Sequence, residues 1–308
     1  MTALRAFNND PSIKAAILER LSRHLAAQEV QAIGVPEWEN GKGSLSGCLA
    51  HSADPLDFER ELGMPRAIAA LLDCLYAVVN PPTADYSQQP VLFLQGVASG
   101  ADLTPLPALF IAWLLDNPQN EFMDSVDRPN IRLLIQSIVD AHHRVAKGDV
   151  PAPSAWAQMR REAMAISDSQ TDLPATDGNR RAAALAEVAA WPSVDSLTVV
   201  SEVLDAHMDI YRFAAQQRAT DETGWSDADE QQRQLFLTEQ KALIESMGTQ
   251  STESIRKATG SLQKDPRFSP SLAKMWRTVE AYGKAQPPLA QRYWEAIRRL
   301  ASEASRAS

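Results

Sequence analysis

Residues Asp54–Val79 read DPLDFERELGMPRAIAALLDCLYAVV and contain the signals that set the fold class. Asp54 followed by Pro55 is a typical helix start, because an aspartate caps free amide groups and proline suits the first turn. Gly63 favours a helix end, and Pro65 cannot extend the preceding helix but can begin another. In that second helix the apolar residues recur every three or four positions, at Ile68, Leu71, Leu72, Leu75 and Val79. The stretch therefore predicts two helices that meet at a corner.

The same helix signals recur along the rest of the chain, with capping residues and prolines before apolar stripes of helical period. Strand-type alternation is absent over any useful length. Helices are predicted over residues 11–25, 55–62, 65–79, 91–98, 105–115, 129–145, 179–190, 194–218, 269–284 and 288–303, and from residue 226 onward. We therefore expect an all-α protein, a multi-helix bundle or array of about ten to twelve helices.

Domain boundaries are predicted from proline and polar residues. Val150–Ser154 contains two prolines and is a candidate domain joint, and Gln170–Gly178 is a polar stretch typical of a linker. These features predict an N-terminal helical domain over residues 1–150, a linker with a short helix over 151–174, and a C-terminal helical domain over 175–308.

Most of the net negative charge lies in the first half of the chain. The protein has 308 residues, 44% of them hydrophobic and 22% charged, which is ordinary for a folded protein. Residues 1–150 hold 11 Lys and Arg against 18 Asp and Glu, and the whole chain has a formal net charge of −9. An acidic surface repels phosphate backbones, so we expect no nucleic-acid partner, whereas a basic protein partner would suit it.

Localisation is predicted from what the sequence lacks. No apolar run approaches the ~18 residues of a membrane span, and the N-terminal stretch has no continuous apolar core, so neither a membrane segment nor a signal peptide is expected. Two cysteines, Cys48 and Cys74, are too few for a disulfide framework or a four-thiolate zinc site. We expect a cytoplasmic protein.

The glycine-rich segment Gly41–Glu61 concentrates reactive side chains ahead of the two helices. Cys48 and His51, three residues apart, are residue types that ligate zinc, and Asp54 follows three residues later. A closed site needs four ligands, the other histidines are remote in sequence, and Asp54 is also a helix cap. The prediction is therefore that there is neither a metal site nor a cofactor.

Catalytic and binding roles are the other hypotheses for this segment. Cys48 would be a nucleophile if His51 lay within hydrogen-bond reach as its base, and Glu59 would be an acid or base alongside Glu61 and Asp73. A buried thiol and solvated carboxylates are the structural alternatives. For binding rather than catalysis, the candidates are Trp38, Lys42, His51 and Glu59.

Six stretches resemble a module of uncharacterised, alanine-rich bacterial helical proteins. They are WENGKGS (Trp38–Ser44), GCLAHS (Gly47–Ser52), FERELGMP (Phe58–Pro65), LLD (Leu71–Asp73), GADLT (Gly100–Thr104) and FIAWLLD (Phe110–Asp116). The resemblance implies no mechanism. This chain has Ser44 where the pattern has its first cysteine, which argues against a metal or redox role that needs two thiolates.

Two classes of function remain open on this sequence. The first is a non-enzymatic protein-interaction module, such as an immunity- or antitoxin-like protein that binds a basic partner, because the first half is acidic and no catalytic set is evident. The alternative is an enzyme or a small-ligand or metal-binding protein that uses the Gly41–Glu61 segment. Convergence of His51, Cys48 and a second carboxylate in a concave pocket would favour the alternative.

Overall fold

The all-α fold class is confirmed by a computed structural model, which describes residues 3–78, 84–117, 123–124, 126–169, 177–194, 196–247, 252–285 and 288–307. The helices in chain order are η1 (Ala6–Asn9), α1 (Pro11–Ala26), α2 (Leu45–Ala50), α3 (Pro55–Leu62), α4 (Arg66–Ala77), α5 (Ala84–Ser87), α6 (Gln89–Gly96), α7 (Leu106–Asp116), α8 (Pro129–Ala146), α9 (Pro153–Asp168), α10 (Gly178–Ala189), α11 (Val199–Thr223), α12 (Asp227–Met247), α13 (Thr252–Gln263), α14 (Ser269–Ala285) and α15 (Leu289–Ala307). The two short strands β1 (Trp38–Glu39) and β2 (Lys42–Gly43) pair antiparallel.

The chain forms two compact units. Unit 1 comprises Met1–Ile210 and Pro288–Ser308, and unit 2 comprises Tyr211–Pro287. This division differs from the boundary predicted near Val150, because α9 and α10 pack on α8 within unit 1 and α15 returns to pack on α6 and α7. The packing of helices far apart in sequence, which local composition does not encode, sets the boundary.

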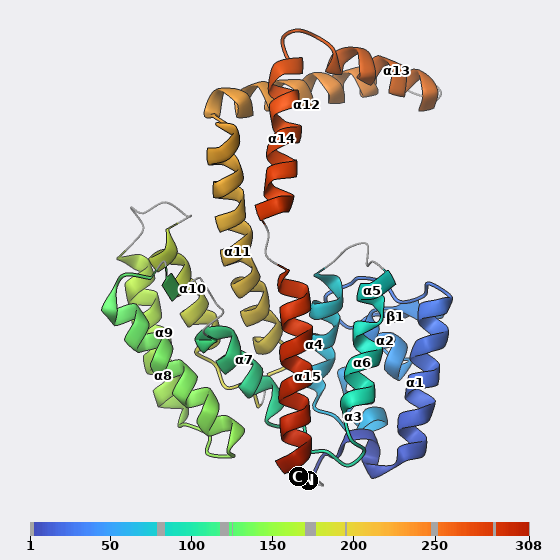
Figure 1. Ribbon diagram of the computed structural model, residues 1–308, viewed down its shortest axis with the longest axis vertical. Helices are drawn as coiled ribbons and strands as arrows, with labels where there is room; N and C mark the ends of the chain where they lie inside the picture. Colours follow the sequence, from blue (N-terminus) through green and yellow to red (C-terminus); the bar gives the residue numbers. More distant parts are fainter. Residues whose placement is uncertain are drawn as a thin grey trace. The chain divides into compact units, whose positions relative to one another are not determined.

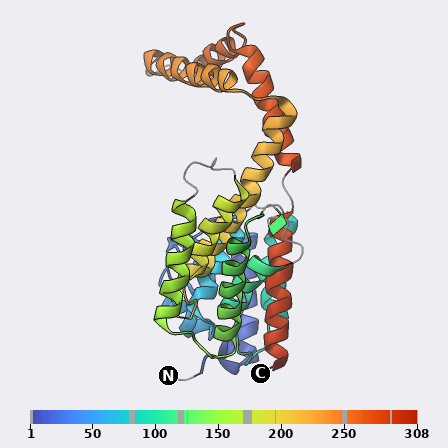
Figure 2. The ribbon, with the colours of Figure 1, turned by 90° about the vertical axis from the view of Figure 1, so that its left-hand side faces the viewer.

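Unit 1 is held together by α15, the last helix, which runs beside α6 and α7 in both views (Figures 1 and 2). Trp294 on α15 is fully buried, and its indole nitrogen donates to the hydroxyl of Tyr86 at 3.0 Å. The Tyr86 hydroxyl in turn donates to the carbonyl of Leu75 on α4. Because a buried indole and hydroxyl need partners, this chain of bonds fixes α15 against α4 and α5.

The predicted corner between α3 and α4 is confirmed. Asp54 caps α3 by accepting from the amide of Leu56 at 2.9 Å, and α3 ends at Gly63, whose φ is +63°. Helix α4 then starts after Pro65, and most of its side chains are buried. A Cβ atom at Gly63 would overlap the carbonyl of Arg5, so glycine both ends α3 and lets the N-terminal segment pack closely.

Unit 2 contains the second part of α11 with α12, α13 and α14. Its apolar core, among the described residues, consists mainly of Phe236, Phe268 and Leu272. Polar contacts add to it, since Lys274 contacts Asp229 at 2.6 Å. Unit 2 has 11 Lys and Arg and 10 Asp and Glu, whereas unit 1 has 19 Lys and Arg and 29 Asp and Glu. The net negative charge of the protein therefore belongs to unit 1.

Some boundaries differ from the predicted ones. The helix expected from Val194 begins at Val199, because the hydroxyl of Ser196 accepts from the amide of Val199 at 3.2 Å and caps the helix there. Val79 and most of the predicted linker Gln170–Gly178 lie outside the described residues. None of the helices in the described ranges combines the length and hydropathy of a membrane-spanning segment.

Candidate functional site

The glycine-rich segment forms a tight hairpin followed by the short helix α2. Asn40 and Gly41 both have positive φ, +50° and +81°, as the turn of a two-residue hairpin requires. Trp38 pairs with Gly43, and Glu39 with Lys42. A Cβ atom at Gly43 would overlap the carbonyl of Glu37. Gly41 therefore serves the turn and Gly43 close backbone packing, and the exposed Lys42 lies in the hairpin.

Two of the predicted binding residues, Trp38 and His51, lie in one cluster with His24 and Glu29. The rings of Trp38 and His51 stack with centroids 4.8 Å apart and an interplanar angle of 13°. Nε2 of His51 lies 2.9 Å from Nε2 of His24, and Nδ1 of His24 lies 2.7 Å from a carboxylate oxygen of Glu29. We call His24 and His51 the histidine pair.

Glu29 fixes the direction of one hydrogen bond in this cluster. A carboxylate only accepts, so Nδ1 of His24 carries the hydrogen that it donates to Glu29. One hydrogen lies between Nε2 of His24 and Nε2 of His51. Burial lowers the pKa of His51, and the nearby charge of Arg20 lowers it further, which favours the neutral ring. His51 ends α2 with φ of +53°, so its backbone is held in a region that few residues other than glycine adopt.

Cys48 is not placed to act as the predicted nucleophile. It is buried, and its Sγ faces the carbonyl oxygens of Gly43 at 3.6 Å and Glu29 at 3.7 Å. Burial raises the pKa of the thiol to about 12, so the thiolate is scarce at neutral pH. This surrounding argues against a nucleophilic role and fits the alternative of an inert core thiol.

The three carboxylates considered as an acid–base set are separated. Asp73 is fully buried and accepts from the amide and the hydroxyl of Ser46. Burial raises its pKa to about 7, although the bonds from Ser46 act in the opposite direction. Glu61 is exposed, and Glu59 lines a groove, so the arrangement does not form a shared catalytic site.

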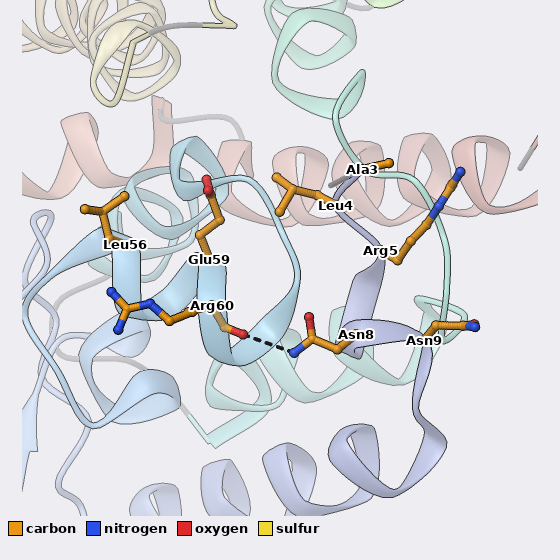
Figure 3. A pocket seen from close by; sticks show the side chains of 8 residues that line it. All are labelled: Ala3, Leu4, Arg5, Asn8, Asn9, Leu56, Glu59 and Arg60. Carbon is orange, nitrogen blue, oxygen red and sulfur yellow. Dashed lines mark hydrogen bonds between the residues drawn. The ribbon is translucent and has the colours of Figure 1, made fainter. Parts of the chain in front are cut away.

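A groove runs past Glu59 on unit 1. One cavity of about 470 Å³ is lined by the N-terminal segment and α3, including Arg5, Glu59 and Arg60 (Figure 3). A second cavity of about 500 Å³ shares Leu4, Leu56 and Glu59 with the first and extends towards Arg66 and Pro107. We call the two together the Glu59 groove. Its shared centre therefore combines two leucine side chains with one carboxylate.

The carboxylate of Glu59 is oriented by the start of α4, because the amide of Arg66 donates to its Oε2 at 3.3 Å. This bond satisfies one free amide of the helix start and leaves the other carboxylate oxygen for a ligand. Two arginines that line the groove have acidic neighbours, Arg60 with Asp57 at 3.0 Å and Arg5 with Asp102 at 3.8 Å. In Figure 3 these guanidinium groups point to opposite sides of the view.

One wall of the groove has an unusual backbone that the sequence did not reveal. Phe7, Asn8 and Asn9 all have φ between +52° and +59°, a conformation that costs energy in residues other than glycine. The wall is held in place because Phe7 is fully buried and the side-chain amide of Asn8 donates to the carbonyl of Arg60 at 3.0 Å (Figure 3). The pair of asparagines is the only local signal for it, since asparagine tolerates this region best.

Comparison with protein-family models, curated proteins and solved structures finds no match for this chain. The resemblance to alanine-rich bacterial helical proteins therefore stays a prediction. Among the described residues, no group of three or more His, Cys, Asp or Glu side chains is arranged to hold a metal ion.

Proposed function

We propose that this chain is a non-enzymatic protein-interaction module, and that its Glu59 groove binds a basic, partly apolar segment of a protein partner. The observation that carries the proposal is the shared centre of the two cavities, where Leu4 and Leu56 flank the carboxylate of Glu59. A lysine or arginine of the partner would pair with Glu59, and an adjacent apolar side chain would cover the leucines.

Burial at the groove and the net charge of unit 1 support this choice of occupant, although Arg5, Arg60 and Arg66 line the groove together with Glu59. Leu56 is 46% exposed, and covering a leucine side chain contributes about 1.5–3 kcal/mol when it is fully removed from water. Unit 1 holds 29 Asp and Glu against 19 Lys and Arg, which attracts a basic partner over a distance of about one Debye length. An extended segment suits two adjoining cavities better than a compact small molecule does.

The enzymatic alternative has less support. Cys48 is buried beside carbonyl oxygens, and Glu59 is bonded to a backbone amide, so neither has a histidine as its base. An immunity- or antitoxin-like role is a narrower form of the same proposal, in which the basic partner is a toxin. Co-expression with the products of neighbouring genes, scored by growth, tests that narrower form.

The groove itself is tested with a random twelve-residue peptide library displayed on phage and selected against the full chain. We expect enriched peptides to contain a lysine or arginine next to an apolar residue. Binding of a synthesised peptide should be lost in Glu59→Lys, should weaken in Leu56→Ala, and should fall as salt is raised. Glu19→Lys, an equal change of charge at an exposed site on α1, is the matched control and should keep most of the affinity.

Two results would refute the proposal. One is enrichment of peptides without basic residues. The other is a peptide whose affinity drops equally in Glu59→Lys and Glu19→Lys, because net charge alone would then account for binding. Glu59→Gln separates binding from stability, since the amide oxygen of Gln can still accept from Arg66 while the charge is gone.

A further inference from the structure

We propose that unit 2 pairs with unit 2 of a second copy of this chain, through the face of α14 that carries Trp276, Val279 and Gly283. Trp276 is 64% exposed and Val279 is 53% exposed. Apolar side chains that are exposed next to each other, unlike isolated ones, are typical of an interaction surface. This surface, which we call the Trp276 face, belongs to unit 2 and does not depend on the function proposed for the Glu59 groove of unit 1.

The three residues lie on one side of α14, away from α11. An α-helix turns by about 100° per residue, so Gly283 lies about 20° and Val279 about 60° around the helix from Trp276. Thr278, on the opposite side, is buried, and its hydroxyl lies 2.7 Å from the hydroxyl of Thr223 on α11. The Trp276 face is therefore the side of α14 that α11 does not cover.

Gly283 leaves a hollow on this face, two turns along from the tryptophan. Its φ is not positive, so its backbone conformation does not require glycine. An added Cβ atom would meet nothing within 4 Å, and glycine stabilises a helix less than alanine does. Packing within the described part of the chain does not account for a glycine here, whereas close approach of a bulky side chain from another molecule does.

The Trp276 face is complementary to itself. In an antiparallel pair of α14 helices, a two-fold axis that passes between Val279 and Glu280 places Trp276 of each copy opposite Gly283 of the other, because both lie equally far from the axis. The bulkiest side chain of the face then covers its hollow twice, once on each side of the axis. A two-fold interface of this kind uses the same patch on both subunits. This match favours a second copy as the occupant.

Charge on unit 2 permits the same pairing. In this antiparallel register Glu280 lies about 3 Å along the helix axis from Arg277 of the partner subunit, since each residue advances the helix by about 1.5 Å. Glu280 also contacts Lys284 of its own helix at 2.7 Å, so each carboxylate would lie between two cations. Unit 2 as a whole has 11 Lys and Arg and 10 Asp and Glu, and two copies of it therefore repel each other little.

The test is sedimentation equilibrium of the full chain over a hundredfold range of protein concentration. Because one helix pair is small beside the interfaces of about 1,200–2,000 Å² in stable complexes, we expect a reversible dimer whose fraction rises with concentration. Trp276→Ala and Gly283→Gln should each raise the dissociation constant at least tenfold. Glutamine favours a helix more than glycine does, so Gly283→Gln removes the hollow without weakening α14.

Gly260→Gln is the matched control, because Gly260 lies within α13 and its added Cβ atom also meets nothing within 4 Å. It should leave the dimer unchanged, and circular dichroism of each variant should match that of the wild type. A monomer at every concentration would overturn the proposal. A dimer that survives both Trp276→Ala and Gly283→Gln, or that Gly260→Gln weakens as much as Gly283→Gln does, would overturn it as well, since another surface would then hold the copies together.

Discussion

Asp73 on α4 accepts two hydrogen bonds from Ser46 on α2, at 2.6 Å from its amide and at 2.5 Å from its hydroxyl. Both residues are buried, so this contact joins the start of α2 to the middle of α4 inside the core of unit 1. The sequence does not predict this pairing, because the two residues lie 27 positions apart.

The burial of Asp73 makes stability depend on pH. Its native pKa of about 7 lies above the ordinary value of 3.8, so between these values the native state binds a proton that the unfolded state has lost. The contribution of Asp73 to the free energy of unfolding is therefore full at low pH and falls as pH rises from about 4 to 7. Asp73→Asn should lack this fall.

Urea unfolding at pH 5 and pH 8 measures the difference. The free energy of unfolding of Asp73→Asn, relative to the wild type, should increase between the two pH values. The exposed Asp116→Asn is the matched control. An equal change in the free energy of unfolding between the two pH values, in the wild type and in Asp73→Asn, would contradict the assignment.

Both cysteines should react slowly with thiol reagents in the native protein. Cys48 is buried with a raised pKa, and Cys74 is 5% exposed with its Sγ 3.2 Å from a carboxylate oxygen of Asp205. Labelling with a chromogenic disulfide should be much slower in buffer than in denaturant. Equal rates for either thiol would mean that it is accessible, and a reactive-thiol function would regain support.

Gly63→Ala should destabilise the protein by about 1–3 kcal/mol, because an alanine there would adopt φ of +63° and overlap the carbonyl of Arg5. Gly96→Ala, at the end of α6, is the control, since its added methyl group meets no atom within 4 Å. Thermal unfolding of the two variants compares them. Equal midpoints would show that the N-terminal segment does not pack closely on Gly63.

Asp54→Ala should cost about 1 kcal/mol, because it removes the side-chain oxygen that accepts from the amide of Leu56 at the start of α3. Asp54→Ser keeps an acceptor and should recover most of that loss. Chemical denaturation of the three proteins provides the measurement. No difference between Asp54→Ala and wild type would mean that water replaces the cap without cost.

The sequence predicts helix ends well where the signal is local. Asp54 and Gly63 bound α3 as expected, because capping and left-handed glycine act within a few residues. The hairpin at Asn40 and Gly41 was missed as a strand pair, although an Asn–Gly turn is a strong local hairpin signal. The strands are only two residues long, too short for alternation to be visible.

The candidate sites were predictable only in part. Trp38 and His51 were named as binding residues and do meet, but their partner His24 lies 27 residues before His51, a distance that only the packing of α1 against α2 closes. Glu59 was expected to share a site with His51 and instead lines a separate groove. The left-handed residues that build its wall depend on the buried ring of Phe7, which is a tertiary effect.

The most direct test of the account is the amide resonance of Arg66, because that N–H donates to the carboxylate of Glu59. A lysine-containing peptide from the library selection would be titrated into isotopically labelled protein and followed by nuclear magnetic resonance. The account predicts that the Arg66 amide and the Leu4 methyl groups shift with saturation, while the resonances of His51 do not. Saturable binding that leaves Arg66 and Leu4 unchanged would contradict it.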